Sequence, residues 1–254
     1  MKLPVPSPYE WTARLKPALF TLLPIFVSIA VWVPEVWTVL GALSGLLAAC
    51  GVTALLAQVA RHRGKRLEAR DPEIGPRLSI ALMRHGDQRI DRFTKGRYHR
   101  FLAANGHEIP SPEQEQTDPA EADERYRACM TWLLEATRDE KKFALLLREN
   151  IAYGFRRNLL AMKTIALPIL IASLVVNAIA LWSQWPDFET RAWAALGVEV
   201  ALIAALIAWL FVINRDFWAD ASLSYGTRLL SCCDALGGAA TKKAIRTAKA
   251  QPST

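Results

Sequence analysis

One carboxylate stands inside an otherwise uncharged apolar stretch of the chain. Glu199 is the single charged residue between Ala192 and Asn214. Hydrocarbon does not solvate a charge, so an ionisable group in a membrane span faces a bundle interior, a water-filled path or a partner. Glu199 is therefore the candidate for intramembrane chemistry, with three roles open: a satisfied packing group, a group on an ion pathway, or a contact with a partner protein.

Asn177 is the candidate partner of Glu199. Glu199 lies about 9 Å from Trp193 along a helix that rises about 1.5 Å per residue, and Asn177 falls at a similar depth when counted back from the same turn. We expect an antiparallel pair of helices to place the two side chains together. In a dry bundle the pair would be a hydrogen-bonded contact, whereas a carboxylate lining a wet pore would favour cations.

The Arg84-His85-Gly86 segment resembles the Arg-His-Gly element of histidine phosphatases. In that family the His accepts the phosphoryl group and the Arg binds phosphate. The family also needs a larger α/β domain and a second catalytic His, and this helical chain departs from both. No nucleophile–base pair or phosphate loop is visible elsewhere, so we expect a non-enzymatic protein and treat His85 as an ordinary domain residue.

The cysteines and histidines do not follow the spacing of a metal site. The chain has four of each, and the cysteines are Cys50, Cys129, Cys232 and Cys233. The last three fall in segments that we expect to be cytoplasmic, where the reducing environment keeps thiols free. We therefore expect neither a bound metal nor a disulfide, and no cofactor.

Four apolar stretches have the length that a membrane-spanning helix needs, about 20 residues. They cover residues 17–33, 36–60, 164–184 and 192–214, and the first three contain no charged residue. The expected fold class is an all-α membrane protein with four transmembrane helices in two hairpins and a helical cytoplasmic domain between them. The expected domains are 1–60 (first hairpin), 61–158 (cytoplasmic domain), 159–214 (second hairpin) and 215–254 (amphipathic helix and basic tail).

The basic residues predict the orientation, because Lys and Arg in short loops remain on the cytoplasmic side. They flank the inner ends of all four stretches, whereas the two outer turns hold Glu35, Asp187, Glu189 and one basic residue, Arg191. We expect both termini in the cytoplasm of a bacterium, with the spans in its inner membrane. Tryptophans mark the two interfaces: Trp32, Trp37, Trp182, Trp185 and Trp193 outside, and Trp11, Trp209 and Trp218 inside.

Small residues recur every fourth position on two of the spans. Such stripes let helix backbones approach closely in lipid. They predict either packing within the hairpins or a homo-oligomer interface. The candidate packing residues are Gly41, Gly45 and Ala49 on the second span and Gly197 and Ala201 on the fourth.

Basic side chains at the inner ends of the spans are candidate contacts for anionic lipid or for an acidic partner or small anionic ligand. They are Arg61, Arg63, Lys65, Arg66, Arg156 and Arg157.

Between residues 61 and 100 there are 12 basic and 5 acidic side chains, and between 101 and 149 there are 6 basic and 11 acidic. Opposite charges in the two halves favour a folded domain over a linker. No nucleic-acid-binding module is recognisable, so no nucleic acid is expected.

Local signals predict helices in this domain. Asp118 and Pro119 are an N-cap and an N1 proline, and Asn105-Gly106 is a stop for a helix over 91–104. We expect a loop over 109–117, a helix that continues from Leu147 into the third span, an amphipathic helix after the fourth span, and a disordered or membrane-surface basic tail beyond Gly238.

The segment Glu149-Asn150-Ile151-Ala152-Tyr153-Gly154-Phe155-Arg156-Arg157-Asn158 resembles a motif of uncharacterised bacterial four-span membrane proteins, for which no activity is established. We expect a cytoplasmic sensing or interaction domain coupled to an oligomeric transmembrane bundle, one form of which is a pore-forming effector. The alternative is a membrane anchor or scaffold that recruits cytoplasmic proteins to a larger assembly.

Overall fold

The computed structural model describes residues 7–75, 77–185 and 190–250, with the backbone alone for Pro34, Val39, Leu40, Leu43, Ser44 and residues 239–250. Over these residues the chain contains helices and no strand, as the sequence predicts. It divides into two compact units, residues 1–70 with 151–219 and residues 71–150 with 220–254.

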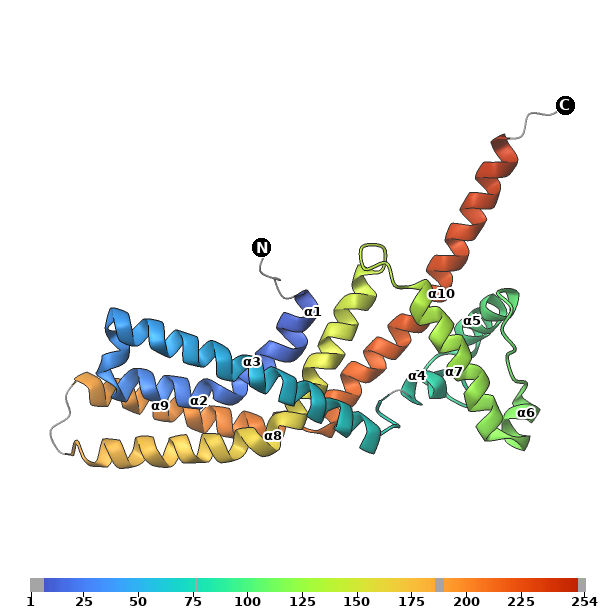
Figure 1. The fold of residues 1–254 in the computed structure, drawn as a ribbon. Coiled ribbons are helices and arrows are strands. Elements are labelled where there is room, and N and C mark those ends of the chain that lie inside the picture. Colours follow the sequence, from blue (N-terminus) through green and yellow to red (C-terminus); the bar gives the residue numbers. More distant parts are fainter. Residues whose placement is uncertain (1–6, 76, 186–189, 251–254) are drawn as a thin grey trace. The chain divides into compact units, whose positions relative to one another are not determined.

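The first unit contains the long apolar helices, and Figure 1 shows α2, α3, α8 and α9 running side by side. Its elements are α1 (Pro8–Glu10), the π-helical η1 (Trp11–Leu15), α2 (Lys16–Trp32), the 3-10 turn η2 (Pro34–Trp37), α3 (Val39–Arg70), most of α8 (Ala144–Trp182), α9 (Thr190–Ile207), the π-helical η3 (Ala208–Val212) and the start of α10 (Arg215–Ala250).

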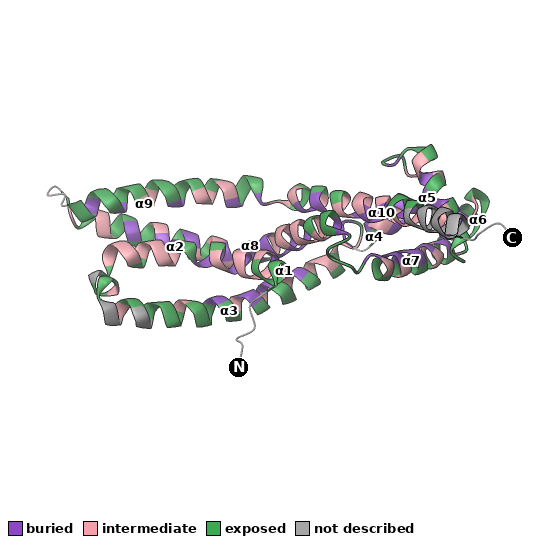
Figure 2. Ribbon diagram, turned by 90° about the horizontal axis from the view of Figure 1, so that it is seen from above, coloured by how far each residue is buried: buried purple, intermediate pink, exposed green. Residues whose placement is uncertain are grey.

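Within the described chain, four helical segments are long and apolar enough to cross a membrane. They are Pro8–Trp32, Gly45–Arg70, Ala144–Trp182 and Thr190–Val212. The prediction of four helices with the length and composition of membrane spans is confirmed. Figure 2 shows exposed residues along the outer sides of these helices. Large apolar side chains lie there, including Leu47, Val176, Ile179 and Phe211, which is the surface that a multi-pass membrane protein presents to lipid.

The core of the first unit lies where three of the helices meet. Ala60 of α3, Met162 and Leu170 of α8, and Leu202 of α9 are buried there together with Trp209 of η3. Small and large side chains alternate across the contact, so the helices pack closely without charged groups between them.

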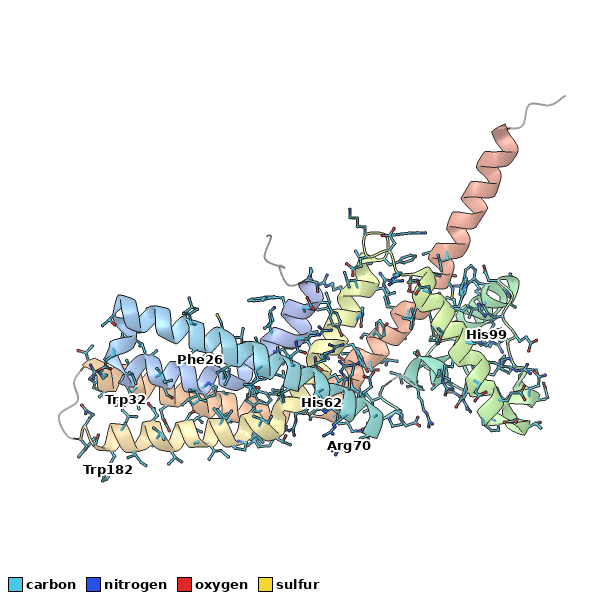
Figure 3. The ribbon with its side chains drawn as sticks, in the orientation of Figure 1. Phe26, Trp32, His62, Arg70, His99 and Trp182 are labelled. Atoms are coloured by element: carbon cyan, nitrogen blue, oxygen red, sulfur yellow. The ribbon has the colours of Figure 1, made fainter. Side chains whose placement is uncertain are left out.

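Two of the tryptophans expected at the inner interface are buried instead. Trp209 and Trp218 are both inside the first unit, and Trp11 is half exposed. At the other end, Trp37, Trp182, Trp185 and Trp193 are exposed, as an interfacial girdle requires. Figure 3 shows Trp32 and Trp182 at this same end of the helices.

The second unit is built from shorter amphipathic helices: α4 (Arg77–Met83), α5 (Arg92–Ala104), α6 (Pro112–Thr117), α7 (Pro119–Ala136), the start of α8 and most of α10. Its core includes Leu82, Leu102, Tyr126, Leu133 and Leu230, each almost fully buried. α4 and α6 both pack on α7.

The cap signals in this unit are confirmed, and the predicted loop is wrong. Asp118 accepts hydrogen bonds from the backbone of Ala120 and Glu121, and α5 ends at Asn105 before Gly106, whose φ is +85°. Residues 109–117 contain α6, because Ser111 and Gln114 form a reciprocal capping box around Pro112. That arrangement starts a helix even in a strongly polar segment.

The basic tail differs from its prediction in secondary structure. The basic tail is helical to Ala250, because its Ala, Lys and Arg residues are strong helix formers. The compact units divide after Arg70, Asn150 and Ala219; the predicted domain bounds after residues 60, 158 and 214 stay a prediction. α3 continues as a helix to Arg70, and α8 already begins at Ala144. Asp187 and Glu189 of the predicted outer turn lie outside the described residues.

Candidate functional site

Three side chains from three helices join in a polar cluster at the tryptophan-rich end of the first unit. Asn177 of α8 is fully buried. Its Nδ2 donates to Oε2 of Glu199 at 2.7 Å and to the carbonyl oxygen of Ala195 at 3.0 Å, and its Oδ1 accepts from Nε1 of Trp32 at 2.7 Å. One amide therefore links α2, α8 and α9.

The predicted contact between Asn177 and Glu199 is present, and Trp32 is the member that sequence reasoning missed. From the sequence, Trp32 is predicted to be an interfacial residue because it lies at the end of an apolar stretch. Its indole N–H falls at the depth of Asn177, and a buried amide oxygen needs a donor. The cluster satisfies its buried amide internally, so its chemistry is that of a structural hydrogen-bond network.

A second polar network joins α3 and α8 to η1. Arg157 is 7% exposed; its Nη1 donates to Oε2 of Glu68 at 2.7 Å, and its Nε and Nη2 donate to Oδ1 of Asn158 at 3.2 Å. The Tyr153 hydroxyl donates to the other carboxylate oxygen of Glu68 at 2.7 Å. Nδ2 of Asn158 donates to the carbonyl oxygen of Ala13 at 2.6 Å.

Two glycines allow the helices to approach at this network. A Cβ on Gly64 would overlap Oδ1 of Asn158, and a Cβ on Gly154 would lie 2.8 Å from the hydroxyl of Tyr9 and 3.1 Å from Cβ of Ala13. A side chain at Gly64 would displace the Asn158 amide, and one at Gly154 would push against Tyr9 and Ala13. The dense polar segment before the third span is thus the place where three parts of the chain meet.

Several predicted lipid or partner contacts face inward instead. Arg157 is buried in the network above, because its guanidinium fork pairs with Glu68 and Asn158 together. Arg63 donates to the carbonyl oxygen of Ala161 at 3.2 Å and to Oγ1 of Thr164 at 2.6 Å. Arg156 donates to the carbonyl oxygen of Phe217 at 3.0 Å. Arg61, Lys65 and Arg66 are exposed, so these three remain candidates.

A lysine caps the broken end of the fourth span. Nζ of Lys163 donates to the carbonyl oxygens of Leu210 at 3.0 Å and Ile213 at 2.8 Å. These carbonyls belong to η3 and the residue after it, where the helix ends and leaves acceptors without helical donors. A cation at a helix C-terminus also interacts favourably with the helix dipole.

Three of the five candidate packing residues make no close contact with another helix of this chain. No neighbouring atom lies within 4 Å of a Cβ built on Gly45 or Gly197, and Ala201 is exposed. A Cβ on Gly41 would overlap the carbonyl oxygen of Glu35. The close approach of the turn η2 to α3 therefore requires a glycine at this position. Ala49 is partly buried. For Gly45, Gly197 and Ala201, an intramolecular packing role therefore has no support in the structure.

Rotation around α9 explains the outcome. Residues advance about 100° each around a helix, so Gly197 lies about 200° from Glu199. The bundle takes in Glu199 together with Ala195 and Leu202, which leaves Gly197 on the outer side. The polar side chain needs a partner in the interior and the glycine does not.

In the second unit, His85 takes part in a structural hydrogen-bond network. Its backbone N–H donates to both carboxylate oxygens of Glu115 at 3.1 Å, and the Tyr126 hydroxyl donates to Oε1 of Glu115 at 2.6 Å. Burial, followed by the hydrogen bond to Glu115, raises the pKa of Tyr126. Arg84 pairs with Asp123 at 2.6 Å, and that hydrogen bond raises the pKa of Arg84.

Among the described residues, no three His, Cys, Asp or Glu side chains are grouped so as to hold a metal ion. The four cysteines are all free; Cys129, Cys232 and Cys233 are buried and Cys50 is exposed. No known protein family, curated protein or solved structure matches this chain. The functional inference therefore rests on the geometry of the two units.

Proposed function

We propose that this chain is a non-enzymatic, multi-pass protein of a bacterial inner membrane whose bundle anchors a helical cytoplasmic interaction domain. One observation supports this best: two partly buried carboxylates of the first unit are hydrogen-bonded from within that unit. Glu199 is bound by Asn177, and Glu68 is bound by Arg157 and Tyr153. A conducting bundle would instead present such groups to water.

The distribution of exposed side chains supports the orientation that we propose. Arg61, Lys65 and Arg66 are exposed on the C-terminal part of α3, and exposed tryptophans gather at the opposite end of the helices. Basic residues favour the cytoplasmic side, and tryptophans favour the headgroup level. Both termini and the second unit would then be cytoplasmic.

Continuity of α8 supports a coupled role for the two units. The helix is unbroken from Ala144 to Trp182, and residues on either side of Asn150 belong to different units. In this proposal, a ligand or partner that binds the second unit acts on the membrane bundle through α8. In the alternative role, the recruitment of cytoplasmic proteins to a larger assembly, the second unit is again the part that binds them.

The first experiment is ion flux through proteoliposomes that hold the purified full-length protein, with wild type beside Glu199→Gln. We expect no flux above that of empty liposomes from either protein. Flux through wild type that Glu199→Gln abolishes would overturn the anchoring role and favour the pore. Thiol labelling of single cysteines placed at Arg66 and at Trp37 in sealed vesicles tests the orientation, and label on the same side at both positions would contradict it.

A further inference from the structure

A cavity of about 340 Å³ lies beside the first turns of α5 in the second unit. Its lining includes two imidazoles, two basic side chains and two carboxylates: His85, His99, Arg92, Lys95, Asp87 and Asp91. Figure 3 labels His99 on α5. The cavity has room for a small organic molecule and is not filled by the side chains around it.

Lys95 is a buried cation on this cavity. It is 3% exposed, and its Nζ donates to the carbonyl oxygens of Arg84 at 2.6 Å and Asp87 at 2.5 Å. Within the part of the chain that the structure describes, no carboxylate forms an ion pair with it. An ammonium has three donors, and two of them are used by these carbonyl oxygens, so one donor is left for a ligand. Burial also lowers the pKa of Lys95.

The nearby carboxylates are committed to other groups. Asp87 accepts two hydrogen bonds from the guanidinium of Arg89 and one from its backbone N–H. Asp91 caps α5 through the backbone of Phe93 and Thr94. Glu115 is bound by His85 and Tyr126. None of them hydrogen-bonds the Lys95 ammonium, so Asp87 and Glu115 act on its charge only through space.

Two imidazoles also line the cavity. Nε2 of His85 lies 2.9 Å from the carbonyl oxygen of Pro110, and Nε2 of His99 lies 2.9 Å from that of Met83. A carbonyl oxygen only accepts, so Nε2 carries the proton in both rings. The ring centroids are 4.8 Å apart.

We infer that this cavity binds a small molecule that carries a phosphate group. Lys95 supplies a buried ammonium, and Arg92 supplies an exposed guanidinium at the cavity wall. Phosphate offers several oxygens and up to two negative charges, which suits donors arriving from several directions. The inference rests on the proposed role of the second unit as the binding unit, and it names the ligand class of that unit.

The test is calorimetric titration of the full-length protein in a maltoside detergent, which contains no phosphate. The probes are inorganic phosphate and glycerol 3-phosphate, with acetate and chloride at matched ionic strength as comparisons. We expect saturable binding of glycerol 3-phosphate and none of acetate or chloride. Arg92→Gln should weaken binding about tenfold or more, since one charge-assisted hydrogen bond is lost. Arg100→Gln, on the same helix but outside the cavity lining, is the matched control.

Lys95→Gln should weaken binding at least as much, and circular dichroism decides whether that variant is folded. Because Lys95 also holds two backbone carbonyls, Arg92→Gln decides the question if Lys95→Gln unfolds. Absence of saturable phosphate binding, or equal weakening by Arg100→Gln, would overturn the inference. Nanodiscs with phosphatidylglycerol distinguish the source: loss of glycerol 3-phosphate binding there assigns the cavity to a lipid headgroup, and unchanged binding assigns it to a soluble ligand.

The two proposals fail separately. Ion flux measures the bundle around Glu199, whereas the titration measures the cavity beside α5. If the protein shows neither ion flux nor phosphate binding, the anchoring role stands and the phosphate ligand is overturned. Flux that depends on Glu199, together with phosphate binding, would overturn the anchoring role and keep the site.

Discussion

Oδ1 of Asn158 lies against Gly64, in the position that a Cβ on that residue would occupy. The same oxygen accepts two hydrogen bonds from Arg157, so it cannot move away without breaking them. The absent side chain of Gly64 on α3 is thus a condition for the polar network on α8. This relationship accounts for the glycine in the middle of a long helix, where it costs helix stability.

Replacing Gly64 by Ala should destabilise the protein by about 2 kcal/mol, because the new methyl group overpacks a site with no free volume. The matched control is Gly51→Ala in the same helix, where no atom lies within 4 Å of the added Cβ. Thermal unfolding in detergent, followed by circular dichroism, compares the two variants. Equal melting temperatures for both would contradict the packing that we describe.

Removal of the Arg157 guanidinium should cost more than removal of any exposed basic side chain of α3. Arg157→Met leaves Glu68 partly buried without its cation, which costs about 3 kcal/mol. Arg66→Met is the control, because Arg66 is exposed and exposed charges contribute about 0–1 kcal/mol. The melting temperatures of both variants measure the difference. A small effect at Arg157 would mean that water or lipid replaces the pair.

The hydrogen bond between Asn177 and Glu199 should appear as a coupling energy of about 0.6 kcal/mol, a typical value within membrane bundles. A double-mutant cycle with Asn177→Leu and Glu199→Leu, measured by unfolding in mixed detergent micelles, yields it. Glu199→Gln should remain close to wild type because its amide oxygen still accepts from Asn177. Independent effects of the two leucine substitutions would rule out a direct bond.

Gly197→Leu together with Ala201→Leu should reduce the oligomeric state of the protein. Both positions are exposed on α9, so the larger side chains leave the fold intact and block close approach of a second copy. Mass photometry in detergent counts the copies. Ala172→Leu, an exposed alanine on α8, is the control. An unchanged oligomer in the double variant would exclude this stripe as the interface.

Stability of the second unit should fall as the pH falls below the ordinary His pKa of 6.5. Burial lowers the pKa of His99 below that value, and the charge of the nearby Lys95 acts in the same direction. The unfolded chain then binds a proton more readily than the folded one, at a slope of at most about 1.4 kcal/mol per pH unit.

His99→Gln should weaken this acid sensitivity, because the Gln amide can still donate to the Met83 carbonyl but does not titrate. His62→Gln, on an exposed position of α3, should leave it unchanged. Melting temperatures between pH 7.5 and pH 5 test both variants. Retention of the full acid response in His99→Gln would assign it to another group.

The sequence by itself determined the spans and the local helix signals. Uncharged runs long enough to cross a bilayer identify the four apolar helices, and Asp118-Pro119 and Asn105-Gly106 identify helix ends, because these effects act between residues close in the chain. The capping box at Ser111 carried the same kind of signal for α6 and could have been found. Counting residues from the outer turn places Asn177 and Glu199 at the same depth in neighbouring spans, and this was also sufficient to predict their contact.

The tertiary structure decided which side of each helix faces inward and which polar groups meet. Gly197 and Arg157 show this: a small-residue stripe lies outside, and an expected lipid anchor lies inside. Helix rotation depends on the total free energy of packing and hydrogen bonding over several helices, and no single stretch of sequence contains it. The indole of Trp32 and the overlap excluded at Gly64 arise from residues more than ninety positions away, and only the folded chain brings them together.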